Sequence, residues 1–230
     1  MNYDPHMNPD IYAAGAVQER NKVLRNTYWL LALSLVPTVI GAFLGVYLNF
    51  LAIKPLYFLG IFLVGSYGLM FAIQKNKNSM LGVILLLVFT CFMGLMLSRL
   101  VGMVLGRYSN GPQLIAMAFG GTGAIFFVMA SLATIIKRDL SPIGKWLSVG
   151  SLLVLAAAVS SFFFSFSSPM MLTLLVMIMA ISSAFLLYKV QQIVNGGETN
   201  YVVATLDVYV SLFNIFQSLL HILGIFGGDD

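Results

Sequence analysis

Long apolar runs alternate with short polar connections along most of the chain. Each run is continuously apolar over about 20 residues, which is the length of a helix that crosses a bilayer. Strands of a membrane barrel would instead alternate apolar and polar positions. The pattern predicts seven membrane-spanning helices, at residues 27–47, 55–74, 79–97, 115–136, 143–164, 169–188 and 205–226. The alternative is six spans and a re-entrant last segment, because that segment is the most polar of the set.

Composition and the polar N-terminus fix the predicted domain organisation. Of 230 residues, 60% are hydrophobic and only 9% are charged, whereas soluble domains carry about a quarter charged residues. We therefore expect an all-α, multi-pass membrane protein with one seven-helix transmembrane domain over residues 27–228. Residues 1–26 are polar and do not fit a cleaved signal peptide. We expect them to form a short, largely disordered cytoplasmic tail.

Basic residues are unevenly distributed among the connections. If the N-terminus is cytoplasmic, nine of the twelve lysines and arginines lie inside, and only Lys54, Arg99 and Arg107 lie outside. Short cytoplasmic loops are enriched in Lys and Arg. The bias therefore predicts a cytoplasmic N-terminus and, with seven spans, a C-terminus on the opposite side.

Several kinds of chemistry lack their sequence signatures. The chain contains no G-x-S-x-G nucleophile turn and no H-E-x-x-H zinc helix, and two histidines with the single Cys91 do not make a typical transition-metal site. The basic residues flank apolar runs instead of forming one patch, so we expect no nucleic-acid binding. We predict no catalytic residues, no metal and no cofactor.

Small residues recur at four-residue spacing inside two runs. Membrane helices approach closely through such faces, because no hydrophobic force drives them together. The faces therefore predict the helix contacts of a compact bundle. They comprise Ala116, Gly120 and Ala124 in one run, and Gly68 and Ala72 in another.

The last run carries a polar stripe on one side of the expected helix. Its members follow one another at alternating spacings of four and three residues, which confines them to one wedge at about 100° per residue. The opposite side is apolar, so we expect this helix to lie inside the bundle with the others around it. The stripe consists of Asp207, Ser211, Asn214, Ser218 and His221.

Lys189 and Asp207 are candidates for a contact at one mouth of the bundle, and two interpretations of them stay open. In the structural one, each charge suits the dipole of its helix end, and the other polar groups join helices by hydrogen bonds. In the functional one, the stripe lines a hydrated path that a Lys189 to Asp207 contact closes. Titration of that contact would then make opening depend on pH.

Four stretches of the chain resemble a known family. They are "VLRNTYWLLALSL" from Val23, "YGLMF" from Tyr67, "IAMAFGGTGAIFF" from Ile115 and "GGETNYVVATLDVYVSLFNIFQSLLHILG" from Gly196. They are similar to the YccA-like branch of the Bax inhibitor-1-like family, also called the transmembrane BAX inhibitor motif family, over residues 23–224. The resemblance implies a bundle in the bacterial inner membrane, with six helices around a central C-terminal helix and a periplasmic C-terminus.

The resemblance also implies a function. Members of this branch associate with the membrane protease FtsH and its HflK and HflC partners, and they modulate the degradation of membrane proteins. The protease engages their N-terminal cytoplasmic tail, which here corresponds to residues 1–26. The leading hypothesis is therefore a non-enzymatic inner-membrane regulator of an FtsH-type protease.

Other branches of the family imply an alternative, a pH-sensitive ion leak for calcium or protons. In those branches two acidic residues share protons near the cytoplasmic mouth. The matching positions here are Lys189 and Ser211, and neither is acidic. A Lys189–Asp207 pair could replace that arrangement, but a cation at this position repels calcium. We therefore carry over no calcium ligands, and cation passage gated near Lys189 and Asp207 remains the alternative.

Overall fold

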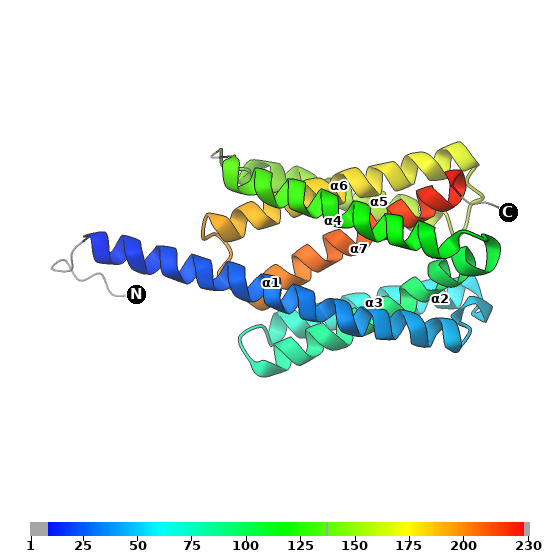
Figure 1. Ribbon diagram of the computed structural model, residues 1–230, viewed down its shortest axis with the longest axis horizontal. Coiled ribbons are helices and arrows are strands. Elements are labelled where there is room, and N and C mark those ends of the chain that lie inside the picture. The colour runs from blue at the N-terminus through cyan, green and yellow to red at the C-terminus, as the bar shows by residue number, and fades with distance from the viewer. Residues whose placement is uncertain (1–8, 137, 228–230) are drawn as a thin grey trace.

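The computed structural model describes residues 9–136 and 138–227. Over these residues the chain forms α-helices joined by short loops and one 3-10 turn (Figure 1). The helices are α1 (Pro9–Tyr47), η1 (Phe50–Ala52), α2 (Pro55–Lys75), α3 (Met80–Arg107), α4 (Gly111–Ile135), α5 (Ser141–Ser160), α6 (Ser168–Val194) and α7 (Tyr201–Phe226). All seven α-helices are long and apolar enough to cross a membrane. The predicted all-α, seven-helix membrane fold is confirmed.

Prolines mark where several of the helices begin. Pro55, Pro112, Pro142 and Pro169 each lie at the first or second helical position. Proline suits this position because its fixed φ angle is helical and its missing N–H would have no partner there. α3 continues ten residues beyond the predicted span end at 97, so Arg99 lies within a helix instead of in a connection.

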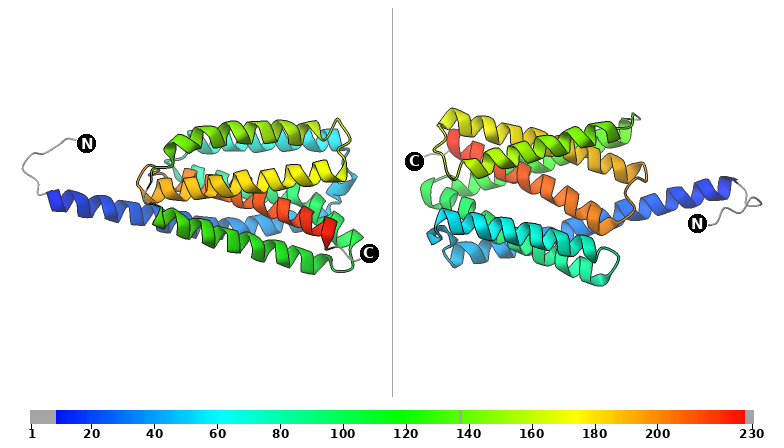
Figure 2. Two further views of the ribbon diagram at one scale, coloured as in Figure 1. Left: turned by 90° about the horizontal axis from the view of Figure 1, so that it is seen from above. Right: turned by 180° about the vertical axis from the view of Figure 1, so that it is seen from behind.

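α7 forms the centre of the bundle, as the polar stripe predicted. It runs obliquely through the molecule and packs against α1, α2, α3, α4 and α6 (Figures 1 and 2). Because it is one continuous helix of 26 residues, the re-entrant alternative is wrong. The ring around it is incomplete, however, since α5 packs mainly on α6. Five helices pack around α7, instead of the six that we expected.

α1 and α3 pack backbone to backbone through glycines. A Cβ atom at Gly41 of α1 would overlap the Cys91 carbonyl oxygen, and one at Gly94 of α3 would overlap the Thr38 carbonyl oxygen. Such close approach is what small residues permit in membranes. The helix pair therefore depends on the absence of side chains at these positions.

The small-residue faces predicted from spacing are not the ones that pack. Ala116, Gly120 and Ala124 are all exposed on the surface of α4, and nothing lies within 4 Å of the position of a Cβ at Gly120 or at Gly68. The prediction was wrong because four-residue spacing places residues on one helical face but does not say whether that face meets a helix or lipid.

The N-terminal segment differs from the predicted disordered tail. α1 begins at Pro9, so residues 9–26 continue the first membrane helix without a break, and the first turns of α1 project beyond the other helices (Figures 1 and 2). The segment "AVQERNKVLR" from Ala16 is rich in good helix formers, and an existing helix needs no new nucleation to extend. Residues 1–8, Lys137 and residues 228–230 lie outside the described part of the chain.

Candidate functional site

The connection between α6 and α7 begins with a tight turn directly after the last residue of α6. Gly196 adopts a left-handed backbone with φ of 78°, which a glycine adopts without strain. The N–H groups of Gly197 and Glu198 then donate to the Gln192 carbonyl at 2.8 and 3.2 Å. Both bonds cap one carbonyl group that the helix end would leave without a partner. The Gly-Gly pair thus turns the chain directly into α7.

Asn200 begins α7 and ties it to the loop between α2 and α3. Its side-chain oxygen accepts hydrogen bonds from the N–H groups of Val202 and Val203, at 3.0 and 3.1 Å. Its Nδ2 donates to the Lys77 carbonyl at 3.0 Å and to Asn78 Oδ1 at 2.8 Å. One amide side chain therefore caps the central helix and also holds its first turn against the α2–α3 loop.

An ion pair joins the two helices just inside this connection. The Lys189 Nζ atom of α6 lies 2.8 Å from Asp207 Oδ2 of α7. The two side chains are only 25% and 27% exposed, so the pair is partly shielded from solvent. The Lys189 ammonium group also lies 5.6 Å from the centre of the Tyr188 ring. The structure thus brings together the two charged residues that the sequence singled out, while the role of the pair stays a prediction.

The rest of the polar stripe follows α7 away from the ion pair. Ser211 is buried, and its hydroxyl donates to the backbone carbonyl of Asp207 at 2.9 Å, not to the carboxylate. Ser218 is also buried, whereas Asn214 and His221 are half-buried. Ser211 therefore satisfies its own helix, which is how membrane helices commonly accommodate a hydroxyl group.

Two further side chains join separate segments at this end of the bundle. Gln191 of α6 is 2% exposed, and its amide nitrogen donates to the carbonyls of Ile136 and Arg138, both at 2.9 Å. Its amide oxygen accepts from the N–H of Leu140 at 3.1 Å. Arg20 of α1 donates from Nη1 to the Val194 carbonyl at 3.4 Å.

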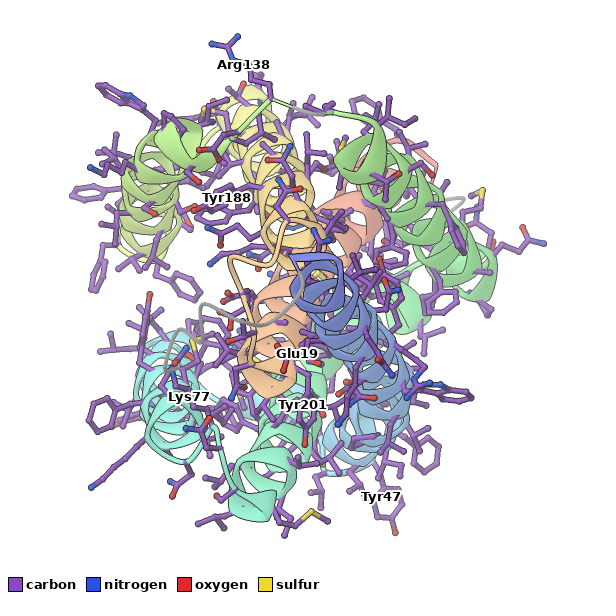
Figure 3. The ribbon with its side chains drawn as sticks, turned by 90° about the vertical axis from the view of Figure 1, so that its left-hand side faces the viewer. Glu19, Tyr47, Lys77, Arg138, Tyr188 and Tyr201 are labelled. Atoms are coloured by element: carbon purple, nitrogen blue, oxygen red, sulfur yellow. The ribbon has the colours of Figure 1, made fainter. Side chains whose placement is uncertain are left out.

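The α6–α7 junction is therefore a hub for the loops at one end of the molecule. Figure 3 looks onto this end, and its labelled residues Lys77, Arg138, Tyr188 and Tyr201 belong to the α2–α3 loop, the α4–α5 loop, α6 and α7. The sequence patterns did not predict Gln191 and Asn200 as parts of this hub. Asn200 carried a readable signal, because an asparagine directly before an apolar run is a typical helix N-cap. Gln191 carried none, since its partners are distant in sequence.

Two cavities lie beside α7, on different sides of the helix. A cavity of about 680 Å³ lies between α1, α3, α4 and α7, and the apolar side chains of Leu212 and Phe216 line it. A cavity of about 280 Å³ lies between α2, α3, α5 and α7, and His221 lines it. Asp207, Ser211, Asn214 and Ser218 line neither of these two cavities.

The described residues contain no group of three or more His, Cys, Asp and Glu side chains arranged to hold a metal ion. What the junction supplies chemically is one partly shielded ion pair and a set of hydrogen bonds that joins four chain segments. These contacts can hold the ends of neighbouring helices together, and their loss would let the helix ends separate. The strength of these contacts depends on charge and on the integrity of the loops.

Comparison with known proteins identifies the family. The family described as inhibitor of apoptosis-promoting Bax1 matches residues 20–228. The chain is 39% identical over 206 residues to the Escherichia coli protein named modulator of FtsH protease YccA, covering 89% of this chain and 90% of that one. It is 36% identical over 218 residues to an uncharacterized Pseudomonas aeruginosa protein, covering 95% and 96% of the two chains.

A third relative is described as a membrane protein. It is an uncharacterized membrane protein of Vibrio cholerae that is 36% identical over 215 residues, covering 92% of this chain and 93% of the relative. These matches extend over nearly the whole chain and agree with the seven apolar helices. This multi-pass membrane protein belongs to the Bax inhibitor-1-like family.

Proposed function

We propose that this chain is a non-enzymatic regulator in the bacterial inner membrane that modulates the degradation of membrane proteins by an FtsH-type protease. In this proposal it associates with the protease and with HflK and HflC. The similarity to the Escherichia coli protein named modulator of FtsH protease, across nine-tenths of both chains, supports the proposal. The Escherichia coli relative is named as a modulator of a protease and the family as an inhibitor of another protein, which supports a role without catalysis.

The projecting part of α1 is the observation that carries the proposal. Its first turns extend beyond the other helices, as Figure 1 makes visible. Val17, Gln18, Glu19 and Lys22 are exposed there. With a cytoplasmic N-terminus, as the distribution of basic residues predicts, this segment is a helical handle within reach of a membrane-anchored protease.

A truncation can test the handle without disturbing the bundle. Residues 1–19 are removed, and Arg20 is kept because its side chain bonds the Val194 carbonyl. The matched control keeps the length and composition of residues 9–19 but scrambles their order. Each chain is purified in detergent from cells that contain the protease, and the protease, HflK and HflC are probed in the eluate. Turnover of a membrane-protein substrate is followed in the same cells.

The full-length chain is expected to retain the protease complex and to slow substrate turnover. The truncated chain is expected to lose the effect on turnover while its thermal unfolding in detergent stays unchanged. If the truncated and scrambled chains slow turnover as well as the full-length chain does, the handle is excluded. If the full-length chain recovers no protease and leaves turnover unchanged, the regulator proposal itself fails.

A second candidate function rests on the Lys189–Asp207 ion pair. In this candidate the bundle is a regulated leak for protons or cations, and the ion pair closes its mouth. The Asp207 carboxylate contacts the Lys189 ammonium group directly. Protonation of the Asp207 carboxylate would remove its attraction for Lys189 and release α6 from α7. Leakage would therefore increase as the pH falls.

Ion flux from liposomes tests this candidate. Asp207→Asn and Lys189→Ala are compared with the unaltered chain, using a proton-sensitive and a calcium-sensitive dye at acidic and neutral pH. Asp139→Asn is the control, because Asp139 is an exposed carboxylate that bonds Ser141 and takes no part in the ion pair. Flux that equals that of empty liposomes for every variant and pH would reject the leak.

A further inference from the structure

The cavity of about 280 Å³ combines an apolar wall with three polar side chains. Its walls come from α2, α3, α5 and α7, near the end of the bundle where α7 terminates. Most lining residues are apolar, among them Leu63, Leu155 and Phe162. The polar exceptions are Arg99 of α3 and Gln217 and His221 of α7, which converge on the same space.

Arg99 is held in this cavity in a defined orientation. It lies within α3, eight residues before the last residue of that helix. Its Nη1 atom donates to the Ile53 carbonyl at 3.1 Å, and its guanidinium lies 5.0 Å from the centre of the Phe58 ring. A guanidinium has several more N–H donors than this one bond uses. The anchored group thus has donors left to offer a ligand.

The positive charge of Arg99 has no counter-charge in the described part of the chain. The one ion pair found among residues 9–136 and 138–227 joins Lys189 to Asp207. The described acidic residues, Glu19, Asp139, Glu198 and Asp207 among them, belong to the projecting start of α1 and to the α6–α7 end of the bundle. An unpaired charge in apolar surroundings within a membrane span is costly and marks a candidate functional residue.

We propose that this cavity binds the phosphate group of an anionic phospholipid, with Arg99 as the charged anchor. The planar guanidinium matches the oxygen geometry of a phosphate, and such charge-assisted bonds are the strongest available to a side chain. Gln217 and His221 supply further hydrogen-bonding groups from α7. Lys54, which follows the Ile53 carbonyl that holds Arg99, is exposed and adds positive charge close by.

The apolar wall favours a lipid over a free phosphate ion. A dissolved ion would leave a mostly apolar cavity poorly filled, whereas the first carbons of an acyl chain suit Leu155 and Phe162. The size of the cavity fits a headgroup and not a whole lipid, so the acyl chains would continue along the exposed apolar surface of α5. Leu152 and Leu153 lie on that surface.

Native mass spectrometry of the full-length chain in detergent tests the site. Dioleoyl-phosphatidylglycerol is titrated against the unaltered chain, Arg99→Gln, Arg99→Lys and Gln217→Leu. The control is Arg107→Gln, because Arg107 is an exposed arginine of the same helix that does not line the cavity. Dioleoyl-phosphatidylcholine is the zwitterionic comparison, and inorganic phosphate is added alone as a competitor. Thermal unfolding of each variant checks that it is folded.

One tight phosphatidylglycerol site is expected, and Arg99→Gln should weaken it at least about tenfold. Arg99→Lys should keep part of the affinity, Gln217→Leu should reduce it less than Arg99→Gln, and Arg107→Gln should leave it unchanged. Equal losses in the two Arg→Gln variants would overturn the site, because they indicate general surface attraction. Equal binding of phosphatidylcholine would overturn the selectivity for anionic lipid, and displacement by inorganic phosphate alone would overturn lipid as the ligand. If Arg99→Gln unfolds, the Gln217→Leu titration decides the outcome.

Discussion

The ammonium group of Lys189 lies 2.8 Å from the carboxylate of Asp207, and this pair joins α6 to α7 next to the loop that connects them. Removing either charge leaves the other partly buried without a partner. We expect Asp207→Asn or Lys189→Met alone to lower the free energy of unfolding by about 1–3 kcal/mol, between the values for exposed and buried pairs.

The double variant, with Asp207→Asn and Lys189→Met together, should lose less stability than the sum of the two single losses, because no charge is then left unpaired. Unfolding in detergent, followed by tryptophan fluorescence, measures all four states of this cycle. Strictly additive losses would mean that the two side chains do not interact.

The glycines between α1 and α3 should tolerate no side chain. Gly94→Ala places a methyl group against the Thr38 carbonyl, and we expect a loss of about 1–3 kcal/mol, typical of overpacking. Gly120→Ala and Gly68→Ala are the controls, since nothing lies within 4 Å of either new methyl group. Alanine favours helix over glycine, so the controls should be neutral or slightly stabilising. A Gly94→Ala variant as stable as the controls would contradict the close α1–α3 contact.

Asn200 performs two tasks that substitutions can separate. Asn200→Ala removes the cap of α7 and the bonds to the α2–α3 loop, and it should cost about 0.5–2 kcal/mol for the cap alone. Asn200→Asp keeps a cap acceptor for Val202 and Val203 but loses the Nδ2 donor to Lys77 and Asn78. Hydrogen exchange by mass spectrometry should find faster exchange at the start of α7 in the Ala variant only.

The α2–α3 loop should exchange faster in both Asn200 variants, because neither retains the amide nitrogen. Asn195→Ala is the control for general loosening of the connection, since Asn195 is exposed. Protection of α7 that is equal in the Ala variant and the unaltered chain would exclude the capping role.

Gln191 should hold the α4–α5 loop against the end of α6. Gln191→Leu leaves the Ile136 and Arg138 carbonyls and the Leu140 N–H without their partner. We expect trypsin to cleave after Arg138 several-fold faster in this variant, because the loop opens more often. Gln192→Leu, which loses a bond to Tyr188 only, is the matched control. Equal cleavage rates in both variants would mean that the loop is held in another way.

Much of the fold follows from the sequence because hydrophobicity is a local property. Continuous apolar runs gave the correct number of spans, and the polar stripe from Asp207 to His221 marked the one helix that lies at the centre. A face with polar groups is costly against lipid and is favoured inside a bundle. The same logic selected Lys189 and Asp207, which the structure places in contact.

Other features arise only from the tertiary arrangement, because they join residues that are distant in sequence. Spacing selected Gly120, which faces outward, and missed Gly94, whose importance depends on the Thr38 backbone of another helix. The sequence around Gln191 does not indicate a special role, because its partners in the α4–α5 loop are distant in sequence and only the fold brings them close.

The sequence by itself therefore determined which segments cross the membrane and which helix is buried, since burial in lipid or protein selects side chains one helix at a time. Only the tertiary structure decided which helix faces are in contact, that α5 packs on α6 instead of α7, and that Arg99 lines a cavity. Those outcomes depend on the shapes of several helices at once, and no local pattern encodes the fit between them.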